Sequence, residues 1–129
     1  MGSIIKEFNV DSDVTKTWEK VSSVGDVTEL LAGMITECQL DGDKRRCTFA
    51  DGMEVEEKII SVDHQAKRLS YTVTQGPMPI DFHMASIQVS DSSDGTKLVW
   101  TVDITPQELV EPISGMMDMA ISIMKTNLQ

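Results

Sequence analysis

The chain has 129 residues, of which 40% are hydrophobic and 25% are charged, and this composition is typical of one globular domain with one core. We therefore expect a single domain over residues 1–129. The formal net charge of -10 argues against nucleic acid and anionic membranes as partners, because both are bound through Lys and Arg. No apolar run is long enough for a transmembrane helix and no signal-peptide pattern precedes the first strand, so we expect a cytoplasmic protein.

The N-terminal part of the chain predicts one strand followed by two short helices. Apolar and polar residues alternate over 3–10, which indicates a strand with Phe8 and Val10 facing the core. The polar run 11–13 can cap a following helix, and Gly33 can end a second short helix over 27–31. The first of these helices would bury Val14, Trp18 and Val21.

The middle of the chain has a period of two, the pattern of strands that bury one face. Short segments rich in Gly, Asp and Pro separate the alternating runs and are typical of turns. Every connection is short enough to join antiparallel neighbours, so we expect a six-strand meander, with the first strand added at an edge. The predicted strands cover 34–41, 44–51, 53–62, 68–76, 80–90 and 96–104.

A two-residue turn at 42–43 would fix the register of the first hairpin in this meander. Cys38 would then face Cys47, and we expect two reduced thiols, with a reversible cross-strand disulfide as the alternative. The same register places Leu40 opposite Arg45 and Thr36 opposite Phe49. The inward face of the whole sheet would comprise Met34, Thr36, Cys38, Leu40, Cys47, Phe49, Leu69, Tyr71, Val73, His83, Ala85, Ile87, Val89, Leu98, Trp100, Val102 and Ile104.

The last segment, 105–129, predicts a long helix, because its apolar residues recur at steps of three and four. Thr105 and Glu108 can form a capping box at its start. Pro112 interrupts the pattern, so we expect a short first turn, a bend next to this residue and a main helix that reaches about Leu128. This helix is the only element large enough to cover the apolar face of the sheet.

The order of strand, two short helices, six antiparallel strands and closing helix resembles the helix-grip fold of the START-like superfamily. Within that superfamily the chain is similar to the bacterial polyketide cyclase/dehydrase and lipid-transport branch, often called SRPBCC. The local signs are Val14 with Trp18, Arg45 before Cys47, Gly52 followed by Glu57, Asp63 before Leu69-Ser70-Tyr71, Gly76-Pro77-Met78-Pro79-Ile80 and Gly95-Thr96-Lys97-Leu98-Val99-Trp100. The resemblance implies an α+β fold in which a curved antiparallel sheet of about seven strands wraps around the C-terminal helix.

The resemblance also implies a cavity between the sheet and the long helix that holds an apolar ligand. Proteins of this branch more often have an aromatic residue at the position of His83, and this departure implies an altered pocket. The residues that we expect to contact the ligand are Arg45, Cys47, Phe49, Tyr71, Val73, Ala85, Trp100, Ile113, Met116, Met117, Ala120 and Met124. No phosphate-binding loop, zinc motif or nucleophile elbow is present in the sequence, so we expect no cofactor and no metal.

Glu57 and His83 are the candidate catalytic residues, because strand alternation directs both of them inward. A Glu in a partly dry cavity has a raised pKa, and His titrates near neutral pH, so the pair could catalyse enolisation and loss of water. The structural alternative is that Glu57 forms a bridge with Arg45 on the neighbouring strand, while His83 is a hydrogen-bonded residue of the cavity wall.

Three functions therefore follow from the sequence. The first is a binding protein for a small hydrophobic molecule of lipid, polyketide or aromatic type, acting as a monomer or a homodimer. The second is an enzyme of the cyclase/dehydratase type that uses Glu57 and His83. The third is a protein-interaction module that resembles the co-chaperone branch of the superfamily, in which side chains fill the cavity.

Overall fold

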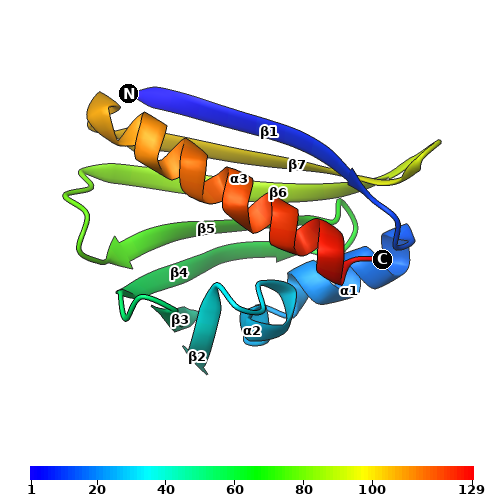
Figure 1. Cartoon of the computed structure of the whole chain (residues 1–129), viewed down its shortest axis with the longest axis horizontal. Helices are drawn as coiled ribbons and strands as arrows, with labels where there is room; N and C mark the ends of the chain where they lie inside the picture. Colours follow the sequence, from blue (N-terminus) through cyan, green and yellow to red (C-terminus); the bar gives the residue numbers. More distant parts are fainter.

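The computed structural model describes residues 1–129 and contains one seven-stranded antiparallel sheet and one long helix (Figure 1). The spatial strand order is β1-β7-β6-β5-β4-β3-β2, so the chain forms a meander from β2 to β7 and β1 pairs with β7 at one edge. This is the predicted helix-grip arrangement. The strands are β1 (Gly2–Val10), β2 (Ile35–Asp41), β3 (Lys44–Phe49), β4 (Glu54–Asp63), β5 (Arg68–Gln75), β6 (Phe82–Ser92) and β7 (Gly95–Thr105).

Two short helices, α1 (Val14–Ser22) and α2 (Val27–Leu30), follow the first strand as predicted. The side chain of Asp13 caps α1 by accepting a hydrogen bond from the amide of Lys16 at 2.8 Å. Trp18 and Val21 face the core, where they are 6% and 3% exposed. The two helices thereby close the end of the molecule where the C-terminus lies (Figure 1).

The long helix α3 (Val110–Asn127) lies across the apolar face of the sheet (Figure 1). Its C-terminal end is held by a hydrogen bond from the amide of Ser12 to the carbonyl of Leu128, and by hydrogen bonds from the side chain of Asn127 to the carbonyls of Glu29 and Leu30. Met117, Ala120 and Met124 are its most buried residues. No helix of the protein is both long and apolar enough to span a membrane.

The start of this helical segment differs from the prediction. Thr105 still belongs to β7, and a short 3-10 helix, η1 (Gln107–Leu109), precedes α3. Neither helix has a side-chain cap, so the predicted capping box is wrong. Pro112 is the third residue of a continuous α3, where its missing N–H would have had no acceptor within the helix, and the break lies instead at the junction of η1 and α3.

The predicted register of β2 holds at one end and fails at the other. Cys38 pairs with Cys47 as expected, but a β-bulge between Ile35 and Glu37 places Ile35, and not Thr36, opposite Phe49. The extra residue reverses which side chains face inward, so Ile35 is buried and Thr36 is exposed. Leu40 was also predicted to face the core and is 45% exposed, because it lies near the end of an edge strand.

Strand β4 contains two register shifts, one between Glu56 and Glu57 and one between Ile59 and Ser61. The second shift leaves Ile60 as an extra residue of β4 and explains why the apolar residues of this strand do not keep one parity in the sequence. The first shift lies in the pairing with β5, where it sets Glu57 opposite Val73, while the uninterrupted pairing with β3 sets Glu57 opposite Arg45.

Candidate ligand-binding cavity

A cavity of about 160 Å³ lies between the sheet and α3. Its wall is mainly apolar, since 22 of its 29 lining residues are hydrophobic. An apolar cavity of about 150 Å³ is large enough for benzene, so this one has room for roughly one ring. Six of the nine methionines of the chain line it, namely Met34, Met53, Met78, Met116, Met117 and Met124. Unbranched Met side chains can rearrange around ligands of different shape.

Most of the residues predicted from the sequence contribute to this wall. The strands provide Arg45, Phe49, Glu57, Tyr71, Val73, His83 and Trp100, and α3 provides Ile113, Met116, Met117, Ala120 and Met124. Cys47 and Ala85 are not part of it. Cys47 packs with Val27 and Ile35 in a separate small cluster, and Ala85, 1% exposed, is sealed within the main core.

The sequence reasoning missed the residues that come from helices α1 and α2 and from two loops. Met53 lies in the β3–β4 connection, and the β5–β6 connection contributes Gly76, Pro77, Met78 and Ile80. Alternation cannot place residues outside strands, although the Gly-Pro-Met-Pro run marked the second loop. Four more lining residues are predicted to face inward but are not among the predicted ligand contacts, namely Met34, Leu69, Ile87 and Val102. The remaining lining residues are Lys20, Val21, Ser23, Val27, Leu30, Leu31, Ile35 and Val55.

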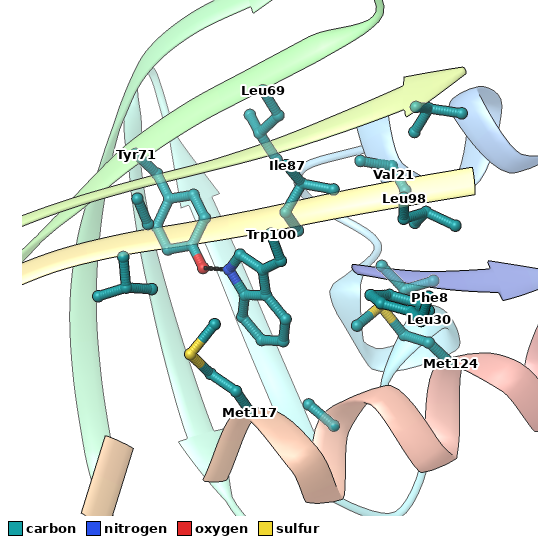
Figure 2. Packing of buried hydrophobic residues seen from close by; sticks show 14 of the residues in the cluster. Phe8, Val21, Leu30, Leu69, Tyr71, Ile87, Leu98, Trp100, Met117 and Met124 are labelled. Atoms are coloured by element: carbon teal, nitrogen blue, oxygen red, sulfur yellow. Dashed lines mark hydrogen bonds between the residues drawn. The ribbon is translucent and has the colours of Figure 1, made fainter. Parts of the chain in front are cut away.

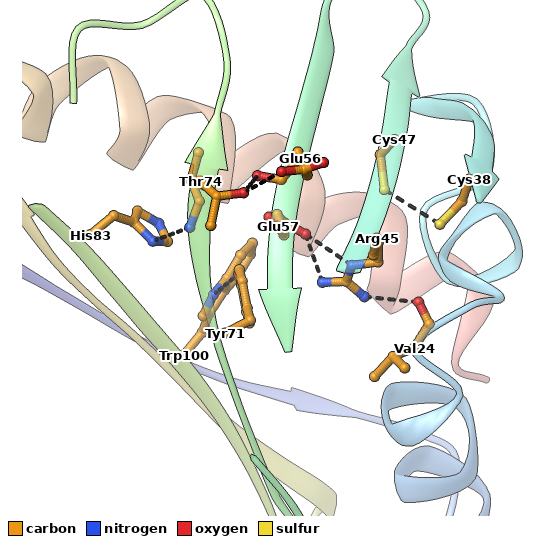
Figure 3. A network of polar contacts seen from close by, with 11 residues as sticks. Val24, Cys38, Arg45, Cys47, Glu56, Glu57, Tyr71, Thr74, His83 and Trp100 are labelled. Atoms are coloured by element: carbon orange, nitrogen blue, oxygen red, sulfur yellow. Dashed lines mark hydrogen bonds and ion pairs between the residues drawn. The ribbon is translucent and has the colours of Figure 1, made fainter. Parts of the chain in front are cut away.

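Arg45 and Glu57 form a buried ion pair in the cavity wall (Figure 3). The Nε and Nη2 atoms of Arg45 lie 2.9 and 2.8 Å from Oε1 of Glu57, and Nη1 donates to the carbonyl of Val24 at 3.1 Å. The side chains are 7% and 19% exposed. Burial is the largest single influence on the pKa of Arg45 and lowers it, but the charge of Glu57, the hydrogen bond to Glu57 and the nearby Tyr71 and Cys47 together outweigh burial, so the pKa is raised overall. The two charges therefore compensate each other inside the protein.

Tyr71 and Trp100 form a second polar contact on the same wall. The indole Nε1–H of Trp100 donates to the hydroxyl oxygen of Tyr71 at 3.0 Å, close to Met117 of α3 (Figure 2). Burial, with the charge of Glu57 as the next cause, raises the pKa of Tyr71, so its hydroxyl is protonated. The guanidinium carbon of Arg45 lies 5.4 Å from the centre of the Tyr71 ring, which adds a cation–π contact.

His83 is fixed by the backbone of the neighbouring strand. The amide of Val73 donates to Nδ1 of His83 at 3.1 Å (Figure 3). Burial lowers the pKa of His83 to about 4, so the imidazole is neutral at pH 7 and its proton is on Nε2. The rings of His83 and Tyr71 have their centres 6.1 Å apart. No hydrogen bond or ion pair joins His83 to Glu57.

The two cysteines are free thiols that face each other across β2 and β3, with their sulfur atoms 3.5 Å apart. Burial, followed by the charge of Glu57, raises the pKa of Cys47, which keeps it protonated. A protonated thiol is a poor nucleophile. No group of three or more His, Cys, Asp or Glu side chains lies close enough to hold a metal ion.

The fold and cavity define a helix-grip protein, and comparison with known proteins is consistent with this class. The model of the family described as polyketide cyclase / dehydrase and lipid transport matches residues 1–129, so the chain belongs to that family. Among curated proteins, none matches this sequence. Membership of this family suggests that the protein binds a hydrophobic ligand.

Solved structures similar to this chain share its fold at low sequence identity. A protein of unknown function from Bacillus thuringiensis has a TM-score of 0.91 at 15% identity, covering 98% of each chain. Ginseng major latex-like protein 151 from Panax ginseng has a TM-score of 0.81 at 16% identity, covering 99% of this chain and 97% of its own. Norcoclaurine synthase from Thalictrum flavum, in complex with dopamine and hydroxybenzaldehyde, has a TM-score of 0.71 at 20% identity, covering 97% and 84%.

Proposed function

We propose that this protein binds a small hydrophobic molecule in the cavity between its sheet and α3. The observation that supports the proposal most directly is the wall of this cavity, which is largely apolar and rich in methionine. A pocket of this kind, with a few polar groups in an apolar wall, is the usual form of a small-molecule site. Norcoclaurine synthase, which shares this fold, was solved in complex with dopamine and hydroxybenzaldehyde, and these single-ring compounds support a small ligand for the present cavity.

Binding is better supported than the two alternatives. A cyclase or dehydratase would need a free base, but Glu57 is tied to Arg45, and Nδ1 of His83 already accepts a hydrogen bond. A pure interaction module would have its interior filled by side chains, whereas this protein has a cavity of about 160 Å³ between its sheet and α3. We therefore favour ligand binding over catalysis and over binding of a protein partner.

The test is uptake of a fluorescent apolar probe, combined with native mass spectrometry of protein purified from its own host. Ala120→Phe should fill the cavity and abolish uptake, whereas Met119→Phe, one residue away on the exposed face of α3, should leave it unchanged. Val73→Phe is a second obstruction at a half-buried position, in case Ala120→Phe does not fold. Uptake that is equal in all variants would refute the proposed site.

A further inference from the structure

The polar groups of the cavity wall limit which kinds of ligand this cavity can bind. Arg45 and Glu57 neutralise each other, and Lys20, the remaining charged residue of the lining, lies 3.4 Å from Glu29. The wall therefore offers no uncompensated charge. A charged ligand would lose its hydration without gaining an opposite charge, which is costly in an apolar environment.

Two neutral donors in the same wall have no acceptor in the protein. The hydroxyl of Tyr71 accepts from Trp100, but its own proton is donated to no protein atom. The Nδ1 atom of His83 accepts from Val73, which leaves Nε2–H as a donor with no protein partner. Both residues line the cavity and both are buried, at 7% and 8% exposure. The one fully buried side-chain N or O atom without a hydrogen-bond partner is Oγ of Ser70, so Nε2 of His83 is accessible, and a ligand oxygen in the cavity would provide the acceptor that both donors lack in the protein.

We propose that the ligand is an uncharged molecule of about one ring with an acceptor oxygen, such as a ketone or ester carbonyl, which Tyr71 and His83 bind through hydrogen bonds. This inference rests on the proposed binding function and makes it more specific. The donors select the oxygen, the compensated charges exclude acids and amines, and the volume limits the size of the ligand. Tyr71 and His83 thus act as specificity residues in an otherwise apolar cavity.

Three probes of similar size and shape separate these contributions: acetophenone with a carbonyl, ethylbenzene without a polar atom, and benzoate with a charge. One hydrogen bond contributes roughly two- to tenfold in affinity, so acetophenone should bind about tenfold more tightly than ethylbenzene when titrated by calorimetry or NMR. Benzoate should bind least. The carbonyl stretch of acetophenone should shift to lower frequency on binding, as expected for an accepted hydrogen bond.

Variants then assign the effect to the named donors. Tyr71→Phe and His83→Leu should each weaken the binding of acetophenone more than that of ethylbenzene, so the ratio of the two affinities should come several-fold closer to one. Each variant should also reduce the infrared shift of the acetophenone carbonyl, and each should still bind ethylbenzene. Thr96→Val is the matched control, because it removes a fully buried hydroxyl that donates to Ser12 outside the cavity, and the ratio should stay unchanged. The amide NMR spectrum of each cavity variant is compared with that of the wild type to check that the variant folds. If one of the two variants does not fold, the other provides the test.

The outcomes separate this inference from the proposed function. Equal binding of acetophenone and ethylbenzene, or tightest binding of benzoate, would overturn the inference and leave hydrophobic binding intact. If none of the three compounds binds and the fluorescent probe is also excluded, the binding function itself fails.

Discussion

At the scale of single residues, the Arg45–Glu57 pair is where a substitution should have its largest effect on stability. Arg45→Met leaves the Glu57 carboxylate in a buried position without its partner, and such a change costs about 3 kcal/mol of unfolding free energy. The double variant with Glu57→Gln should recover a substantial part of this loss. Urea denaturation of the wild type, of Arg45→Met, of Glu57→Gln and of the double variant completes a double-mutant cycle, which measures the coupling energy between the two side chains.

The neighbouring Arg46–Glu56 pair is the matched control for this prediction. It joins the same two strands at 3.1 Å, but its Arg side chain is 57% exposed, and Glu56, whose side chain is 12% exposed, keeps a hydrogen bond from the Thr74 hydroxyl when the Arg is removed. Arg46→Met should therefore change the free energy of unfolding little, because water screens exposed charges. A similar loss for Arg45→Met and Arg46→Met would show that burial of the first pair has no energetic consequence.

His83 should make stability depend on pH. Its pKa is lowered by burial from 6.5 to about 4, so between these values the unfolded chain binds a proton that the folded protein does not. The free energy of unfolding should consequently fall as pH decreases through this range, by up to about 1.4 kcal/mol per pH unit. Urea denaturation at pH 7, 6 and 5 measures the slope, and His83→Leu should flatten it. If His83→Leu shows the same decrease in unfolding free energy with decreasing pH as the wild type, the pH dependence comes from other groups.

The residues of the site could be predicted only where a strand fixes the direction of the side chain. Alternation correctly directed Arg45, Tyr71 and His83 toward the interior. It also directed Cys47 inward, and this side chain is buried, but it packs against Val27 and Ile35 and does not line the cavity. Loop residues such as Met53 and Met78 have no such pattern, since their positions depend on turn geometry and on the packing of the whole fold.

At the scale of elements, Pro112 shows why position within a helix matters more than residue type. As the third residue of α3 it removes no intrahelical hydrogen bond. We expect Pro112→Ala to change the free energy of unfolding by less than about 1 kcal/mol, whereas a proline in the middle of a helix costs about 3 kcal/mol. Thermal and urea denaturation of the variant, with Ser122→Pro in the same helix as the comparison, provides the test. A large change for Pro112→Ala would mean that this residue fixes the junction with η1.

Most helices and strands could be predicted from the sequence, because the spacing of apolar residues depends only on the local segment. The strands appear within about two residues of their predicted limits, and the order of the sheet follows from short connections. The errors lie where one residue changes the local geometry. The bulge next to Ile35 reverses a parity that the sequence of β2 alone does not reveal, and the segment after Thr105 forms a 3-10 turn where a capped helix was expected.

At the scale of the whole molecule, the methionines provide an internal probe of ligand binding. Six of them line the cavity, whereas Met1, Met84 and Met119 lie elsewhere. When the methionine methyl groups are labelled with carbon-13, a bound apolar compound should shift the resonances of the first group and leave the second unchanged. Shifts that include Met119, on the exposed side of α3, would indicate binding to the outer surface instead.

The cavity beneath α3 also has a mechanical consequence. Space enclosed by a folded chain disappears when the chain unfolds, so the unfolded state occupies less volume and hydrostatic pressure favours it. A cavity of about 160 Å³ should therefore make this small protein sensitive to pressure. A molecule that occupies this space would remove part of the volume difference, so compression would favour the liganded form over the free form.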